Sequence, residues 1–95
     1  MHFLYILYSS KLDKFYIGET YDVPSRLEQH NMGFYKNKWT SKGMPWELYL
    51  VIECPSKSVA LKMERHIKNM KSKKYIQNLK SYPEIIERLK LKYST

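Results

Sequence analysis

Apolar and aromatic side chains run without a break through residues 3–8, Phe-Leu-Tyr-Ile-Leu-Tyr. A run this short, rich in aromatic and branched residues, favours a β-strand over a helix. The mostly polar stretch 9–14 predicts a turn, and Phe15-Tyr16-Ile17 predicts a second strand that ends at Gly18. Two short strands joined by a short polar link predict a β-hairpin.

The pattern changes to helical spacing after this hairpin. Asp22 suits a helix N-cap and Pro24 suits a first helical turn. Val23 and Leu27 then share one face of a short helix that ends near Asn31. Residues 33–46 have no clean period and predict an ordered loop that mixes basic and aromatic side chains: Phe34, Tyr35, Lys36, Lys38, Trp39 and Lys42.

The remaining elements follow from residue 47 onward. Residues 47–54 predict a strand that Pro55 ends, and Ser56 or Ser58 then caps a helix with a core-facing stripe: Ala60, Leu61, Met63, Ile67 and Met70. A basic break at 72–74 precedes residues 75–79, which continue as a further turn or form a new helix. Pro83 lies in the first turn of a last helix. This order predicts one α+β domain over residues 1–95, a three-stranded antiparallel sheet flanked by helices.

Composition narrows the class of protein. The chain has 95 residues, which suits one domain, and its 43% hydrophobic and 15% aromatic content argues against disorder. The single cysteine, Cys54, excludes an internal disulfide framework and a Cys-rich zinc site. No apolar run approaches the roughly 18 residues of a membrane span. The first residues lack the features of a signal peptide, so we expect a cytoplasmic protein without membrane contact.

The charge is concentrated in the C-terminal part. Lys and Arg number 17 against 9 Asp and Glu, a formal net charge of +8. Residues 1–56 carry six cations and six acids, whereas residues 57–95 carry eleven cations and three acids. Clustered cations near aromatic side chains are typical of nucleic-acid binding, because neutralising phosphates releases counterions. The alternative is a solvated lysine-rich surface, and charge alone leaves both interpretations open.

Two pairs of polar residues are candidates for chemistry. Arg26 and His30 are four residues apart on the first predicted helix, so they project from one face. Arginine can clamp phosphate oxygens and histidine can move protons near neutral pH. Tyr5 and Tyr16 lie on adjacent predicted strands, where their hydroxyls can meet at one site. The alternatives are a solvent-facing arginine with a histidine at a helix end, and two tyrosines of the core.

A lone acid is the third candidate. Glu64 is the only carboxylate between Glu53 and Glu84, in a stretch of seven lysines and arginines. Mg²⁺ on phosphates needs only one or two carboxylates and keeps several waters. The alternative is a surface ion pair of Glu64 with Lys68, one helical turn further along. His66, two residues from Glu64, is expected on another face of the helix, at the surface or against nucleic acid.

These residues together resemble the GIY-YIG nuclease superfamily, in particular its short stand-alone members similar to the excinuclease C N-terminal domain. The similarity covers about residues 2–80 and leaves 81–95 as a C-terminal helical extension. The motifs of the family occur in order: Phe3-Leu4-Tyr5 in place of Gly-Ile-Tyr, Tyr16-Ile17-Gly18, Arg26-xxx-His30, the loop Thr40 to Trp46, the helix Ala60 to Lys68 with Glu64, and more loosely Asn78. The sequence departs from the family pattern at the first motif, where Phe3 and Leu4 replace Gly and Ile.

The resemblance implies a metal-dependent endonuclease that hydrolyses phosphodiesters in nucleic acid, DNA rather than RNA, in repair or processing. It implies Mg²⁺ or Mn²⁺ on Glu64, Tyr5 as general base, His30 as proton relay, and Tyr16 and Arg26 on the phosphate. The predicted nucleic-acid contacts are basic residues together with the loosely matching asparagine: Lys42, Lys71, Lys73, Lys74 and Asn78. Two alternatives stay open, a non-catalytic nucleic-acid-binding module of the same fold and a protein-interaction domain. No protein partner is identifiable from the sequence.

Overall fold

The computed structural model describes residues 1–33 and 39–94. Its centre is a three-stranded antiparallel sheet in the order β2-β1-β3, formed by β1 (His2–Ser9), β2 (Lys14–Thr20) and β3 (Glu47–Cys54). The predicted α+β class and the hairpin are confirmed. The predicted end of the second strand at Gly18 is wrong, because Gly18 pairs with Tyr5 and the ladder continues to Thr20.

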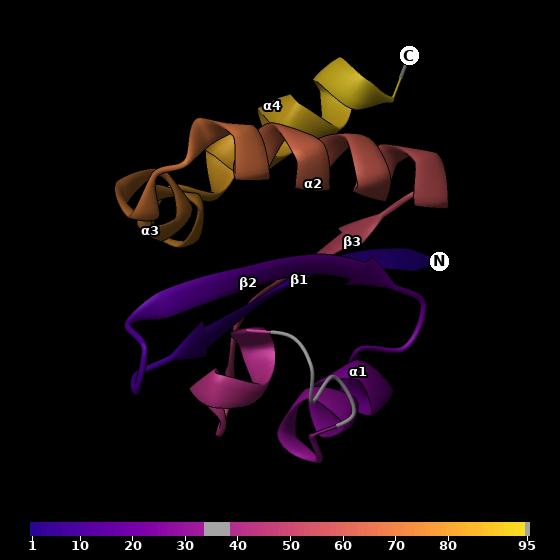
Figure 1. Ribbon diagram of the computed structural model, residues 1–95. Helices are drawn as coiled ribbons and strands as arrows, with labels where there is room; N and C mark the ends of the chain where they lie inside the picture. The colour runs from indigo at the N-terminus through magenta and orange to yellow at the C-terminus, as the bar shows by residue number, and fades with distance from the viewer. Residues whose placement is uncertain (34–38, 95) are drawn as a thin grey trace.

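Helices cover both faces of the sheet (Figure 1). One face carries α2 (Lys57–Met70), α3 (Lys73–Ser81) and α4 (Pro83–Tyr93), and the other carries α1 (Val23–Asn31) and the 3₁₀ helix η1 (Trp39–Gly43). Successive side chains of β1 point to opposite faces of the sheet, so they pack against both helical layers. Leu4 and Ile6 belong to the core under α2–α4, whereas Tyr5 and Leu7 belong to a smaller core under α1.

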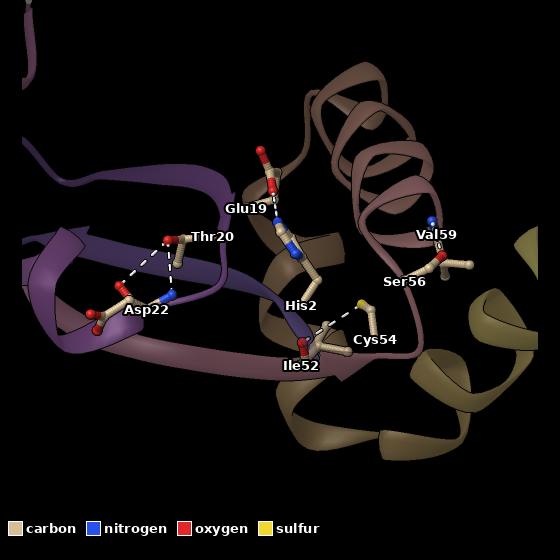
Figure 2. Close-up of polar contacts among 8 residues, drawn as sticks. All are labelled: His2, Glu19, Thr20, Asp22, Ile52, Cys54, Ser56 and Val59. Atoms are coloured by element: carbon tan, nitrogen blue, oxygen red, sulfur yellow. Dashed lines mark hydrogen bonds and ion pairs between the residues drawn. The ribbon is translucent and has the colours of Figure 1, made fainter.

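Side-chain caps set where the helices begin. The Asp22 carboxylate accepts the backbone N–H of Ser25 at the start of α1, as predicted. Ser56, rather than Ser58, caps α2 by accepting from the Val59 N–H (Figure 2). Ser72 caps α3, so residues 75–79 belong to a separate helix rather than to a further turn of α2.

The core-facing stripe of α2 is shorter than predicted. Met63 is fully buried, but Leu61 is 40% exposed, and Met70, the last residue of the helix, is 45% exposed. Lys71 follows with φ of 48°, the left-handed conformation that closes many helices. The predicted ordered loop is partly the 3₁₀ helix η1, and Phe34, Tyr35, Lys36 and Lys38 lie outside the described residues.

The C-terminal helix α4 is joined to the fold by a histidine. His66 Nε2 lies 2.9 Å from the Tyr75 hydroxyl and its Nδ1 lies 3.0 Å from the Tyr93 hydroxyl, which links α2, α3 and α4. His66 is therefore a half-buried structural residue rather than the surface or nucleic-acid contact that we predicted. Among the described helices, none has both the length and the apolar character needed to cross a membrane.

Candidate active site

The site begins with a close approach between two strands of the sheet. A Cβ atom placed on Gly18 would lie 2.6 Å from the Tyr5 hydroxyl oxygen and 2.7 Å from Cζ. Gly18 is opposite Tyr5 in the β1–β2 ladder, so its missing side chain leaves the space that the Tyr5 ring occupies. The glycine of the Tyr16-Ile17-Gly18 motif therefore positions the tyrosine of the preceding strand.

Tyr5 meets His30, which comes from α1. The Tyr5 hydroxyl oxygen lies 3.2 Å from His30 Nε2, and both residues are buried, at 1% and 3% exposure. Burial, and after it the positive charge of Arg26, lower the pKa of His30 to about 4. His30 is therefore neutral at physiological pH, and one ring nitrogen can accept a proton. The histidine at this helix end faces the sheet and not the solvent.

Arg26 and Tyr16 complete the predicted group on this face. Arg26 lies one turn before His30 on α1, half-buried, and its charge acts on the imidazole. The Tyr16 ring stands edge-on to His30 at 4.5 Å between centroids and lies 6.2 Å from the Tyr5 ring. Four of the five predicted catalytic residues, Tyr5, Tyr16, Arg26 and His30, are thus brought together.

Two tryptophans enclose this group and were not predicted to do so. Trp46 is buried, and its ring lies 6.3 Å from Tyr16 and 6.4 Å from His30 between centroids. Trp39 is 47% exposed and stacks obliquely against Tyr16 at 6.1 Å. A sequence signal was present for Trp46, because it ends the loop Thr40 to Trp46 on which the family resemblance partly rests.

Asn31 is a further positioning residue that the sequence did not reveal. Its side-chain amide donates to the Trp46 carbonyl at 2.9 Å, and its side-chain oxygen accepts the Trp46 N–H at 2.6 Å. The Trp46 indole N–H in turn donates to the Thr40 carbonyl at 2.7 Å. These bonds fix the end of α1 to η1 and to the start of β3. They therefore hold His30 against the sheet.

Further polar contacts fix the start of α1 and the edge of the sheet. The Thr20 hydroxyl accepts the Asp22 backbone N–H at 3.0 Å, which sets the turn from β2 into α1 (Figure 2). His2 Nε2 lies 2.5 Å from a Glu19 carboxylate oxygen, across the β1–β2 ladder (Figure 2). Both side chains are 18% exposed, so this pair secures the end of the hairpin nearest α1.

Glu64 lies apart from the tyrosine–histidine group. It is on α2, in the layer over the opposite face of the sheet, and its carboxylate accepts from the Lys68 ammonium at 2.8 Å. The ion pair expected as the alternative to a metal ligand is therefore formed. The Glu64 side chain is 19% exposed, so solvent or substrate reaches it.

The donor set at Glu64 fits one kind of ion. Across residues 1–33 and 39–94 there is no group of three or more His, Cys, Asp or Glu that could hold a metal. Mg²⁺ binds through one or two carboxylates together with substrate phosphates and retained waters. A single accessible carboxylate therefore fits an ion that substrate oxygens help to hold, and does not fit a resident metal in a closed protein cage.

The predicted nucleic-acid contacts are spread over three elements. Lys71 closes α2, Lys74 is exposed on α3, and the Lys73 ammonium donates to the Asp13 carboxylate at 2.8 Å. Lys42 is exposed on η1, and Asn78 is half-buried on α3, where its backbone carbonyl accepts from the Tyr82 N–H. None of these contacts tests their predicted role.

The site has the arrangement that the resemblance to a nuclease family predicts: two tyrosines on adjacent strands of a small antiparallel sheet, with a helical Arg–His pair against them. Comparison with known families agrees, because the profile of the GIY-YIG catalytic domain matches residues 1–78. The chain belongs to the GIY-YIG family, whose nucleases generally use a divalent metal ion. The predicted family is thereby confirmed.

Relatives of known sequence fall into two groups. A UPF0213 protein of Syntrophus aciditrophicus is 37% identical over 84 residues, which cover 87% of this chain and 94% of that protein. The structure-specific endonuclease subunit SLX1 of Scheffersomyces stipitis is 37% identical over 81 residues, 78% of this chain but 24% of that protein. The SLX1 of Cryptococcus neoformans is 41% identical over 51 residues, 52% of this chain and 10% of its own length. No solved structure matches.

Proposed function

We propose that this chain is a metal-dependent endonuclease that hydrolyses phosphodiester bonds in DNA. The observation that carries the proposal is the contact of the Tyr5 hydroxyl with a buried histidine that is neutral at physiological pH. It occurs in a domain of the GIY-YIG family, and the chain is similar to structure-specific endonuclease subunits. The proposal includes a role in DNA repair or processing, and that similarity supports it.

A proton path runs from the attacking water through Tyr5. The Tyr5 oxygen takes a proton from the water while its own proton passes 3.2 Å to His30 Nε2. Tyr5 is 1% exposed, so the attacking water has to be brought to its hydroxyl with the substrate, and His30 rather than bulk solvent receives the tyrosine proton. Burial and the Arg26 charge disfavour the imidazolium, so the proton stays on His30 only briefly.

Tyr16 and Arg26 hold the phosphate on the exposed side of this pair. Arginine offers a rigid fork of donors that matches phosphate oxygens, and it offsets negative charge that develops in the transition state. The water oxygen joins phosphorus, the bond to the 3′-oxygen breaks, and that oxygen takes a proton from solvent water. The proton held on His30 returns to solvent, so the protons balance. The products are a 5′-phosphate and a 3′-hydroxyl. An ion on Glu64, Mg²⁺ or Mn²⁺, would polarise the phosphate and stabilise the leaving oxygen.

One observation favours the second candidate, a nucleic-acid-binding module without catalysis. Glu64 is paired with Lys68, so an ion must displace an ammonium that already neutralises the carboxylate. Exposed pairs of this kind are worth only about 0.3–0.5 kcal/mol on helices. A divalent ion with a bound phosphate outweighs an interaction that small, so we retain the nuclease as the conclusion.

Cleavage of labelled branched, duplex and single-stranded DNA, with Mn²⁺ or with chelator, separates these candidates. We expect products only with the metal, and a strong loss of turnover in Tyr5→Phe with little change in DNA affinity. Tyr8→Phe is the matched control, since Tyr8 lies on the same strand and its hydroxyl donates at 2.7 Å to the exposed Asp13.

Three results would change the conclusion. Cleavage by Tyr5→Phe at the rate of Tyr8→Phe removes Tyr5 as the base. Shifted but intact DNA under every metal condition supports the binding module. Neither binding nor cleavage supports the protein-interaction domain.

A further inference from the structure

A groove of about 310 Å³ lies beside the edge strand β2. It is bounded by β2, by Trp39 of η1 and by the junction of α2 and α3. Isoleucines from three elements line it, Ile17, Ile67 and Ile76, together with the exposed indole of Trp39. Sites for small molecules span roughly 300–1,000 Å³, so this groove has room for one small flat group.

Lysines surround this apolar groove. Lys14, Lys68, Lys71 and Lys73 line it, and two carboxylates pair with members of that set, Glu64 with Lys68 and Asp13 with Lys73. Four ammonium groups against two carboxylates leave an excess of two positive charges. Apolar side chains surrounded by lysines complement a nucleotide, because the base has a flat apolar face and the phosphates are anionic.

The groove lies between the two separated parts of the predicted active site. On one side, the Trp39 ring that lines the groove also packs against Tyr16, at 6.1 Å between centroids. On the other side, Lys68 lines the groove and holds Glu64 at 2.8 Å. The proposed function has one phosphate held by Tyr16 and by an ion that Glu64 would bind, so that phosphate and the nucleotide attached to it would lie next to the groove.

We propose that the groove binds an unpaired base, stacked on Trp39, in the nucleotide next to the phosphodiester at the active site. A base inside a duplex is already stacked and paired, so it cannot enter the groove without leaving the helix. The inference rests on the proposed nuclease function and adds a substrate class to it. The substrate has a single-stranded segment beside the cleaved bond, as in a flap, an overhang or an open junction.

Binding measured without cleavage tests the groove. The full chain is titrated in chelator with a single-stranded oligonucleotide and with a duplex of the same sequence. We expect Trp39→Ala to weaken single-strand binding by about 5- to 100-fold, the range of stacking on one aromatic side chain, and to leave duplex binding unchanged. Tyr82→Ala is the matched control, because Tyr82 is similarly exposed, 53% against 47%, and does not line the groove.

A measurement on the unsubstituted protein covers the case in which Trp39→Ala fails to fold. The fluorescent base 2-aminopurine is placed at each position of a single-stranded overhang in turn. We expect its emission to change strongly at one position beside the duplex junction. Equal emission changes at all positions, or equal loss of single-strand and duplex affinity in a folded Trp39→Ala protein, would overturn the proposal.

These outcomes are separable from failure of the nuclease function. A protein that captures the base at one position but leaves every substrate intact in Mn²⁺ supports the groove and refutes cleavage. A protein that cleaves duplex and overhang substrates equally, with no position-specific emission change, supports the nuclease and refutes the groove.

Discussion

Replacing Gly18 by alanine tests whether the placement of Tyr5 controls activity. The added Cβ would lie 2.6 Å from the Tyr5 oxygen, and ordinary contact begins at 3.4 Å, so the ring must move by the difference, about 0.8 Å. Tyr5 is 1% exposed and has no solvent to move into. A movement of that size changes the 3.2 Å contact of its hydroxyl with His30.

The expected losses follow from this displacement. Overpacking of a core costs about 1–3 kcal/mol of the free energy of unfolding. A misplacement of about 1 Å near the reacting atoms costs on the order of 100-fold in rate. We therefore expect Gly18→Ala to fold, with a lower midpoint of thermal unfolding, and to lose about 100-fold in turnover at saturating Mn²⁺ and DNA.

Gly33→Ala is the matched control for this substitution. Among the described residues, the nearest atom to its Cβ would be Met44 Cε at 4.0 Å, but the backbone φ of +73° strains any residue other than glycine. It should therefore lose comparable stability and keep its turnover. Parental turnover in folded Gly18→Ala, or equal losses of turnover in the two variants, refutes the role assigned to Tyr5.

Three further predictions concern the metal, the basic junction and pH. Glu64→Gln should abolish cleavage and leave the fold intact. The control Glu87→Gln also breaks a helical ion pair with a lysine, and it should cleave normally. Parental turnover of Glu64→Gln under saturating Mg²⁺ contradicts the metal assignment. Lys71, Lys73 and Lys74 lie at the α2–α3 junction, and replacing all three by Gln should flatten the slope of log affinity against log salt by about two to three. The change should be near two if the ion pair with Asp13 keeps Lys73 from binding DNA, and an unchanged slope shows that the lysines only contact solvent. The folded-state pKa of His30, about 4, lies below its unfolded value of 6.5, so its stabilisation is complete above pH 6.5 and is lost as pH falls toward 4. Denaturant titrations should show a loss of about 2 kcal/mol between pH 7 and pH 5 that His30→Gln largely removes, and equal pH dependence in both proteins contradicts this origin.

The elements of the fold were predictable because each carries a local signal. The apolar run of β1, the strand at 47–54 and the cap at Asp22 all depend on residues close in sequence. The continuation of β2 past Gly18 was not predictable, because glycine there makes room for the Tyr5 ring of the neighbouring strand. That reason exists only once the two strands are paired.

The site was predictable in its residues more than in its arrangement. Spacing placed Arg26 and His30 on one helical face, and strand adjacency placed Tyr5 near Tyr16. The burial of His30, which sets its low pKa, depends on the Asn31–Trp46 bonds across 15 positions of sequence. The residues around Glu64 favoured an ion pair over a metal ligand, and only the family resemblance made Glu64 the metal ligand. The sheet that separates it from Tyr5 is a property of the assembled fold.

The central position of β1 has a consequence for how damaged variants will behave. β1 is paired with β2 on one side and with β3 on the other, and its residues Leu4 to Leu7 are all buried. An uncharged, strongly β-forming segment without proline or glycine assembles into intermolecular sheets when its edge is exposed. A substitution that releases β3 exposes that edge, so it should cause concentration-dependent precipitation before reversible unfolding. Activities of variants at the β1–β3 boundary therefore need to be normalised to the soluble, monodisperse fraction, because precipitation through this strand imitates a catalytic defect.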